Sequence, residues 1–103
     1  MSIEAKIKEL GIVLPNSPAP VANYLPVVRT GNLIYLSGMG PAPSLDGKEF
    51  LGKLGKDLSI EEGYQAARLT GINILARLQG YLSDLEKVSR IVKVLSMVNA
   101  SPD

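Results

Sequence analysis

The sequence contains no cysteine and no histidine among its 103 residues. These absences exclude a thiol nucleophile, a Ser-His-Asp triad, a structural zinc site and any acid–base step that a histidine would perform. They also exclude a disulfide framework, which fits a reducing compartment. No run of about 18 apolar residues occurs, so the sequence predicts no membrane-spanning helix. We therefore expect no metal site and no membrane partner.

An excess of either charge is also missing. Eleven Lys and Arg balance ten Asp and Glu to a net charge of +1, which gives no electrostatic reason to expect nucleic acid as a partner. Apolar residues make up 46% of the chain and charged residues 20%, so a single small domain with a real core is expected rather than disorder. The start, Met1–Lys6, carries an acid and is no signal peptide, so we expect a soluble, cytoplasmic protein.

The first half of the chain predicts a short helix, a linker and a β-hairpin. Apolar residues recur at i, i+4 and i+7 over residues 2–10, and Gly11 is a suitable helix stop. Three prolines in residues 14–20 predict an extended linker. Two apolar, β-branched runs, 24–30 and 33–37, flank a Gly-Asn pair, which predicts an antiparallel hairpin.

Ser59 is predicted to open the longest helix, which continues to about Leu82. The run Ser59-Ile60-Glu61-Glu62 fits a capping box, in which a hydroxyl and a carboxylate satisfy backbone N–H groups at the helix start. Gly71 in mid-helix costs about 1 kcal/mol relative to Ala, so we expect it to permit close approach to a sheet. One apolar face is predicted, made of Tyr64, Ala67, Gly71, Leu75, Leu78 and Leu82.

Residues 90–99 are predicted to form the last strand. Its residues are largely apolar on both faces, as in a central strand that is covered on both sides. One helix can cover only one face, so the second cover must be another layer or another subunit. The final residues, 100–103, form a turn sequence that ought to lead into a further element.

Residue chemistry alone gives a candidate pocket but no catalyst. Residues 38–41, rich in Gly, follow a strand and are either a chain reversal or a place where a ligand approaches the backbone. Ser37 has no histidine to activate it, which favours a strand-end hydroxyl over a nucleophile. Tyr24 is either a core or interface aromatic or a ligand contact. The adjacent Glu61 and Glu62 do not face each other on a helix, so capping explains them better than an acid–base pair.

The stretch 24–38 closely resembles the opening hairpin of the RidA/YjgF family, the reactive intermediate deaminases, also called endoribonuclease L-PSP. Residues 52–75 resemble that family's first long helix and its approach, and 84–88 and 98–103 resemble the flanks of its next strand. The resemblance runs from about Pro15 to the last residue. The helical extension at 1–14 points to the longer, YjgF-like or chorismate-mutase-like branch.

The resemblance implies an α+β, chorismate-mutase-like fold: a mixed sheet with helices packed on one face. It also implies a homotrimer with a barrel-like core, in which a neighbouring subunit covers the second face of the strand. Clefts between subunits would bind small carboxylic, imino and keto acids. Active members hydrolyse 2-imino or enamino acids to 2-keto acids and ammonia without a cofactor.

Carried over residue by residue, Tyr24 matches the pocket tyrosine, and Ser37 and Gly38 match the strand-end pair that lines the cleft. Met39 stands where the family often has Gln, which weakens any polar contact there. The family's catalytic arginine and glutamate fall beyond Asp103, so we expect no catalytic residue within this chain and a domain, 1–103, that is incomplete at its C-terminus. The arginines present do not match that position; they are Arg29, Arg68, Arg77 and Arg90.

Three functions remain open at this point. The complete protein is expected to be an imine and enamine deaminase. The alternative is a non-catalytic, ligand-binding or regulatory trimer of the same fold, because fold does not fix function. An endoribonuclease or translation inhibitor is the third possibility, which the absence of a basic run disfavours.

Overall fold

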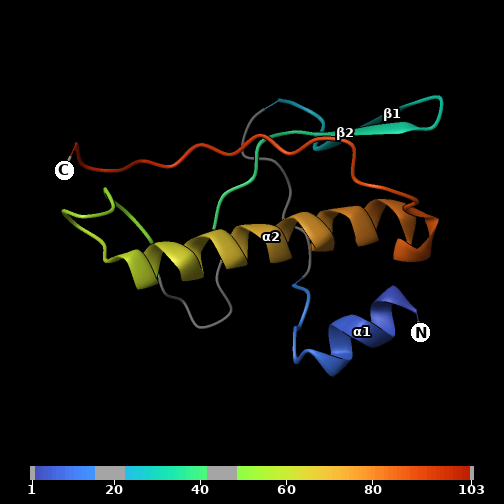
Figure 1. The fold of residues 1–103 in the computed structure, drawn as a ribbon. Helices are drawn as coiled ribbons and strands as arrows, with labels where there is room; N and C mark the ends of the chain where they lie inside the picture. The colour runs from blue at the N-terminus through green and yellow to red at the C-terminus, as the bar shows by residue number, and fades with distance from the viewer. Residues whose placement is uncertain (1, 16–22, 42–48, 103) are drawn as a thin grey trace.

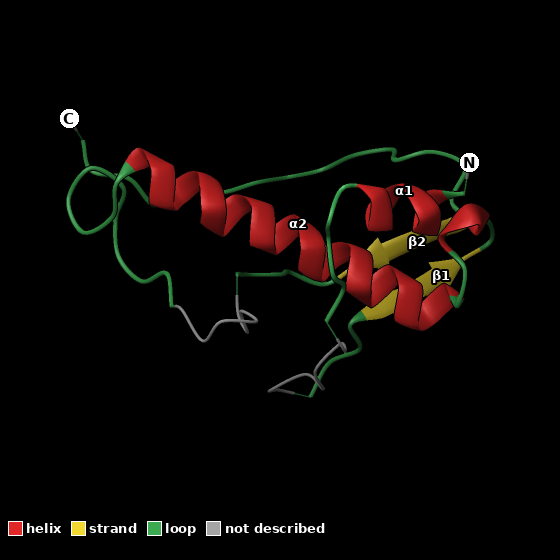
Figure 2. Ribbon diagram, turned by 90° about the horizontal axis from the view of Figure 1, so that it is seen from below, coloured by secondary structure: helices red, strands yellow, loops and turns green. Residues whose placement is uncertain are grey.

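The computed structural model describes residues 2–15, 23–41 and 49–102. In chain order it contains α1 (Ile3–Glu9), β1 (Val27–Thr30), β2 (Leu33–Leu36), α2 (Ile60–Leu82) and the short 3-10 helix η1 (Leu85–Lys87). Figure 1 shows the hairpin and the chain after η1 on one side of α2, and α1 on the other. Figure 2 gives the view from below, with α2 running the length of the molecule. The chain is thus built around one long helix.

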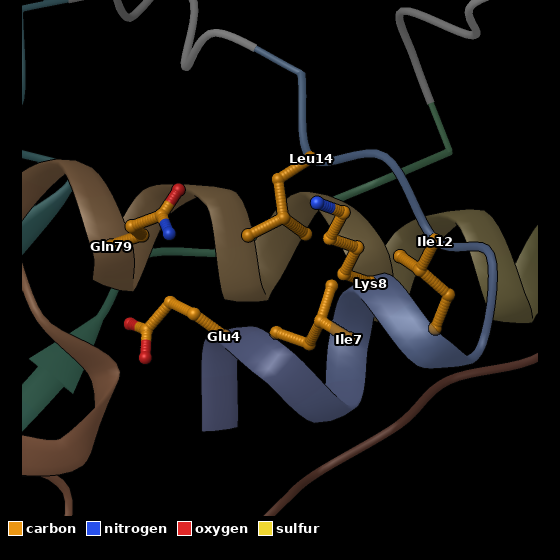
Figure 3. Close-up of a pocket in the computed structure, with 6 residues that line it drawn as sticks. All are labelled: Glu4, Ile7, Lys8, Ile12, Leu14 and Gln79. Carbon is orange, nitrogen blue, oxygen red and sulfur yellow. The ribbon is translucent and has the colours of Figure 1, made fainter. Parts of the chain in front are cut away.

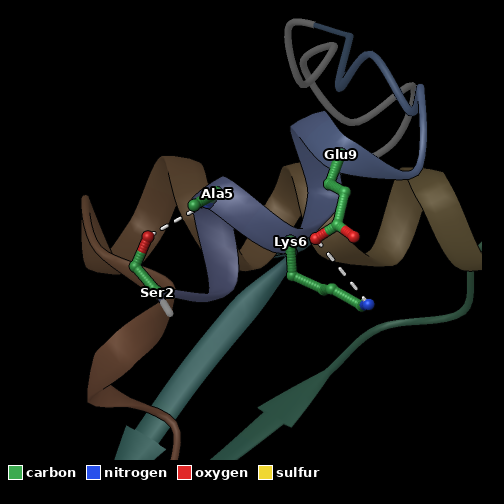
Figure 4. A network of polar contacts seen from close by, with 4 residues as sticks. All are labelled: Ser2, Ala5, Lys6 and Glu9. Atoms are coloured by element: carbon green, nitrogen blue, oxygen red, sulfur yellow. Dashed lines mark hydrogen bonds and ion pairs between the residues drawn. The ribbon is translucent and has the colours of Figure 1, made fainter.

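The predicted N-terminal helix is confirmed as α1, together with the turn that ends it. The Ser2 side-chain oxygen caps the helix by accepting a hydrogen bond of 3.0 Å from the Ala5 backbone N–H (Figure 4). Lys6 and Glu9 form an ion pair of 3.8 Å on the exposed side, which adds little stability in water. Gly11 follows with φ +74°, a left-handed conformation that suits glycine.

The predicted hairpin is confirmed as an antiparallel pair in which Val27 lies opposite Leu36 and Arg29 opposite Ile34. Gly31 at the turn has φ +55°, which explains why a glycine is needed there. Val27 is buried, and β1 contacts α2. The opposite face of the hairpin carries exposed apolar side chains: Val28, Leu33 and Tyr35.

The capping box at the start of α2 is also confirmed. The Glu62 N–H donates to the Ser59 hydroxyl oxygen at 3.1 Å, and the Ser59 N–H donates to the Glu62 carboxylate at 3.0 Å. At the other end, Ser83 adopts φ +68° and the Lys87 ammonium donates to the Leu82 carbonyl at 2.8 Å. Both helix ends therefore have side-chain partners for their free backbone groups.

The predicted apolar face of α2 is wrong in the first half of the helix. Tyr64 and Ala67 are exposed, whereas Asn73 and Ala76 are buried. Leu82 is buried as predicted, yet at about 100° per residue it lies on the side of the helix opposite Asn73. The helix is covered on different sides along its length, because the chain after β2 reaches it at Asn73 and η1 contacts it near its end.

The expectation that Gly71 admits a close neighbour is also wrong within the described chain. A Cβ added there would meet no described atom within 4 Å. Gly63 is the position of close approach instead, because its Cβ would lie 2.5 Å from a methyl carbon of Leu54. The neighbour that this glycine admits is a loop side chain rather than a sheet.

Residues 52–58 form a compact loop that holds the end of the chain. The Lys53 carbonyl accepts from the backbone N–H groups of Lys56, Asp57 and Leu58, at 3.2, 2.8 and 3.0 Å. The Leu54 N–H donates to the Asn99 carbonyl at 3.0 Å, and the Ser101 N–H donates to the Leu54 carbonyl at 2.9 Å. These two bonds make a parallel bridge between Leu54 and Ala100.

The strand predicted over residues 90–99, and its cover on both faces, are not found among the described residues. The segment runs back along α2 in an extended path (Figure 1), without a strand partner between η1 and the bridge at Ala100. Its apolar side chains are between 68% and 90% exposed; they are Ile91, Val92, Val94, Leu95, Met97 and Val98. A strand requires a ladder of hydrogen bonds to a neighbour, and the described residues supply backbone bonds only at the end of the segment, where the Leu54 N–H meets the Asn99 carbonyl.

A pair of glutamates ties α1 to η1, and we call this pair the α1–η1 clamp. The Leu85 N–H donates to the Glu4 carboxylate at 2.7 Å, and the Ile3 N–H donates to the Glu86 carboxylate. Each carboxylate thus serves the first turn of the other helix. Leu85, beside the clamp, is the most deeply buried side chain described.

The described residues form an α+β fold with two helices and a small antiparallel sheet, and its core is small. The buried apolar side chains are Val27, Ala76, Leu82 and Leu85. The radius of gyration is 14.9 Å, compared with about 13 Å for a compact domain of this length. Among the described residues, no helix is both long and apolar enough to cross a membrane.

Candidate functional site

The residues that the sequence singled out, Tyr24, Ser37 and Gly38, lie at the open end of the hairpin. The Ser37 N–H donates to the Pro26 carbonyl at 3.0 Å, and the Ser37 hydroxyl donates to the Leu25 carbonyl at 2.7 Å. Ser37 is therefore held against the two residues that follow Tyr24. We call Tyr24 and residues 37–40 the strand-end site.

The side chains of this site keep groups available to a ligand. Tyr24 is 44% exposed, so its ring and phenol are accessible from solvent. The Ser37 hydroxyl hydrogen is engaged by a carbonyl, which leaves the oxygen lone pairs as acceptors. This geometry supports the strand-end hydroxyl predicted from the sequence and not an activated nucleophile.

The backbone of the site is open at both glycines. A Cβ added at Gly38 or Gly40 would meet no described atom within 4 Å. Gly38 itself is exposed, whereas Met39 is half-buried. The glycines are therefore not required for packing within the described chain, and no described atom occupies the space where a Cβ would lie.

Asn73 of α2 completes this region, and the sequence analysis did not identify it as a site residue. Its side-chain amide donates to the Gly40 carbonyl at 3.0 Å, and the residue is only 5% exposed. In the sequence, Asn73 stands three positions before Ala76, so the two residues share one side of the helix, and this side is buried. Helical spacing does not reveal which loop such an amide meets.

The chemistry of the strand-end site is polar but uncharged. It offers a phenol, a hydroxyl and backbone groups, and it contains no carboxylate or cation. Arg29 lies away from it, because its guanidinium Nε donates to the Gly31 carbonyl at 2.9 Å, at the turn end of the hairpin. Within the described ranges, no group of three or more Asp or Glu side chains could hold a metal ion.

A separate cavity of about 240 Å³ lies between α1, the chain that follows it and α2 (Figure 3). It is lined by Glu4, Ile7, Lys8, Ile12, Leu14 and Gln79, and by none of the strand-end residues. The Glu4 carboxylate already accepts the Leu85 N–H of the α1–η1 clamp. The cavity therefore belongs to the packing of α1 and was not predicted from the sequence.

Comparison with known proteins gives a family match and several relatives. The family model described as "YjgF/chorismate mutase-like, putative endoribonuclease" matches residues 4–102. Protein TCP17 of Trypanosoma cruzi is 37% identical over 100 residues, which are 97% of this chain and 62% of that protein.

Two solved structures share the fold. A protein from Shewanella oneidensis MR-1, described as a "putative endoribonuclease", aligns with a TM-score of 0.81 and 33% identity over 88% of this chain and 60% of its own. The protein Atu1372 from Agrobacterium tumefaciens aligns with a TM-score of 0.72 and 40% identity, over 88% of this chain and 55% of its own. The chain thus spans 55% to 62% of the length of these three relatives.

Proposed function

Since this chain belongs to the YjgF/chorismate mutase-like family, we propose that its protein binds small imino and keto acids and hydrolyses reactive 2-imino or enamino acids. The products are a 2-keto acid and ammonia, and we place the reaction in the cytoplasm. The observation that carries the proposal is the open backbone at Gly38, next to the Ser37 hydroxyl and the exposed Tyr24. A small planar acid can approach such a backbone closely.

The chemistry fits a site without histidine, cysteine or metal. In the imine tautomer the carbon is already electrophilic, so water adds to it and a proton passes to the nitrogen. The C–N bond then breaks, ammonia leaves and the ketone remains. Such a reaction needs a held carboxylate, a placed water and stabilisation of developing charge. Tyr24, Ser37 and Gly38 are proposed as binding groups, and the arginine that would clamp the carboxylate is proposed to lie outside this chain.

We further propose that the protein is a homotrimer with its sites between subunits. The support is the apolar surface on the outer face of the hairpin and along residues 90–99. Exposed apolar area of this extent is typical of surfaces that are buried in an assembly. A subunit placed there would also close the strand-end site from a second side.

The test is the release of ammonia and keto acid from freshly generated 2-aminoacrylate by the intact protein. We expect faster release than in buffer. Trimeric protein that gives no acceleration would defeat the proposal.

The alternative is a non-catalytic trimer that binds the same acids. It is favoured by one observation: the groups described at the strand-end site are a phenol, a hydroxyl and backbone groups, which can bind an acid without turning it over. Pyruvate binding without turnover of 2-aminoacrylate would identify this function.

An endoribonuclease is the third candidate, because the Shewanella oneidensis relative is described in those terms. The net charge of +1 gives little attraction for RNA. RNA cleavage by a preparation free of other nucleases would support the endoribonuclease function.

A further inference from the structure

We infer that Asn73 is a positioning residue for the strand-end site: its amide fixes Gly40 and so places the backbone of Gly38 and Met39 for the ligand. The identity of the ligand rests on the proposed function, whereas the contact that holds the loop is seen in the structure. Asn73 does not touch the ligand in this scheme and acts through the loop alone.

The contact between helix and loop is specific. The Asn73 amide nitrogen donates to the Gly40 carbonyl at 3.0 Å, within the ideal range for such a bond. The asparagine is 5% exposed, and a polar side chain is retained at such depth when its hydrogen bonds are made. The bond joins two residues 33 positions apart, so it ties the end of the hairpin to the middle of α2 (Figure 1).

The loop is held at both ends, and no hydrogen bond among the described residues fixes Gly38 or Met39 between them. At one end, Ser37 is fixed by its N–H on Pro26 and its hydroxyl on Leu25, at 3.0 and 2.7 Å. At the other end, Asn73 holds Gly40. Glycines by themselves leave a backbone flexible, and flexibility weakens a binding site because order must be gained when the ligand binds. Two anchors around Gly38 and Met39 remove that cost before the ligand arrives.

Asn73 is needed because its amide N–H donates a hydrogen bond, and not because of the size of its side chain. Aspartate has the same shape, but its carboxylate would present an oxygen to the Gly40 carbonyl and donate nothing. Alanine would remove the donor and leave the Gly40 carbonyl without this partner. Both changes release the same anchor by different means, whereas a change at the exposed Gln65 on the same helix does not reach the loop.

The experiment compares the intact protein with Asn73→Asp, Asn73→Ala and the control Gln65→Lys, which keeps a donor for the Glu61 carboxylate. ¹³C labels on the methionine methyls and the glycine carbonyls report Met39 and Gly40, and Met97 serves as a remote reference. Pyruvate is titrated into each protein to obtain its Kd. We expect both Asn73 variants to shift the Met39 and Gly40 signals, to leave Met97 in place and to weaken pyruvate by about tenfold, the effect of one lost hydrogen bond. The control should match the parent.

Unchanged Met39 and Gly40 signals in folded variants would overturn the inference, as would shifted signals with an unchanged Kd. Unfolding of both variants would also overturn it, by showing that the bond serves the fold. If the parent protein does not bind pyruvate at all, the proposed function fails. In that case the Gly40 and Met39 signals still decide whether Asn73 holds the loop.

Discussion

Gly38 and Gly31 are two glycines of the same hairpin with different reasons to be glycine. Neither has a described atom within 4 Å of an added Cβ, but only Gly31 has a positive φ, at +55°. Gly31 is therefore required by the turn, whereas Gly38 has neither a positive φ nor a described neighbour that would exclude a side chain. The proposed function supplies a reason for a glycine at position 38, namely a ligand that approaches its backbone.

Gly38→Ala should weaken pyruvate binding by about tenfold, an effect of about 1.4 kcal/mol on binding, because the new methyl group occupies the space proposed for the ligand. Its free energy of unfolding should change by less than about 0.5 kcal/mol. Pyruvate titration and chemical denaturation measure the two effects.

Gly31→Ala is the matched control with the opposite pattern. The positive φ should make it lose about 1 kcal/mol of stability, with pyruvate binding unchanged. A Gly38→Ala protein that binds pyruvate like the parent would remove Gly38 from the site.

Three of the residues proposed for the site were predicted from the sequence, through a resemblance to known motifs. Tyr24, Ser37 and Gly38 lie together because a hairpin places the residues before its first strand beside those after its second. Asn73 could not be identified in this way. Its role depends on a loop carbonyl 33 residues earlier, and no helical period encodes that contact.

At the scale of elements, local signals predicted the helices and the hairpin, and the contacts between elements were harder to predict. Capping residues and turn glycines act on their neighbours in sequence, so α1, α2 and the hairpin followed from the sequence. The buried sides of α2 depend on which distant segment arrives at each turn. Residues 90–99 have the composition of a strand, but a strand exists only with a partner.

Gly71→Ala should stabilise the chain by about 1 kcal/mol, because the helix gains propensity and the new Cβ meets no described atom. Gly63→Ala should gain less, since its Cβ would lie 2.5 Å from the Leu54 side chain, which would have to move. Thermal and denaturant unfolding measure both. A loss of stability at Gly71 would mean that a neighbour covers this side of α2.

Ser59→Ala should destabilise the protein by about 1 kcal/mol, because the Glu62 N–H loses its acceptor at the start of α2. Ser59→Asp keeps an acceptor and should retain the parent's stability. Helical content by circular dichroism during denaturation measures the effect. Equal stability of all three proteins would show that this cap does not support the helix.

At the scale of the whole molecule, the hydrophobic core is small and many apolar side chains remain exposed. Among the described residues, four apolar side chains are buried, whereas six apolar side chains are exposed along 91–98 alone. The composition predicted a hydrophobic core, but it could not show how much of that core forms within one chain.

Leu95→Lys should shift the protein from a trimer toward a monomer, because a charge is costly to bury in an apolar contact. Sedimentation measures the assembly, and Lys93→Glu is the control on the same segment at a position that already carries a charge. A parent protein that sediments as a monomer would contradict the proposed trimer. An unchanged trimer in Leu95→Lys would place its contacts elsewhere.

The α1–η1 clamp has a consequence for the order in which the chain folds. Its two hydrogen bonds join residues 81 and 83 positions apart, and α1 has only seven residues, too few for a helix to persist alone in water. During synthesis, α1 leaves the ribosome before α2 and η1, and its described partners are available only once both have followed it. Although it is made before its partners, α1 is then among the last of these segments to become ordered, since closing so long a loop comes late in folding.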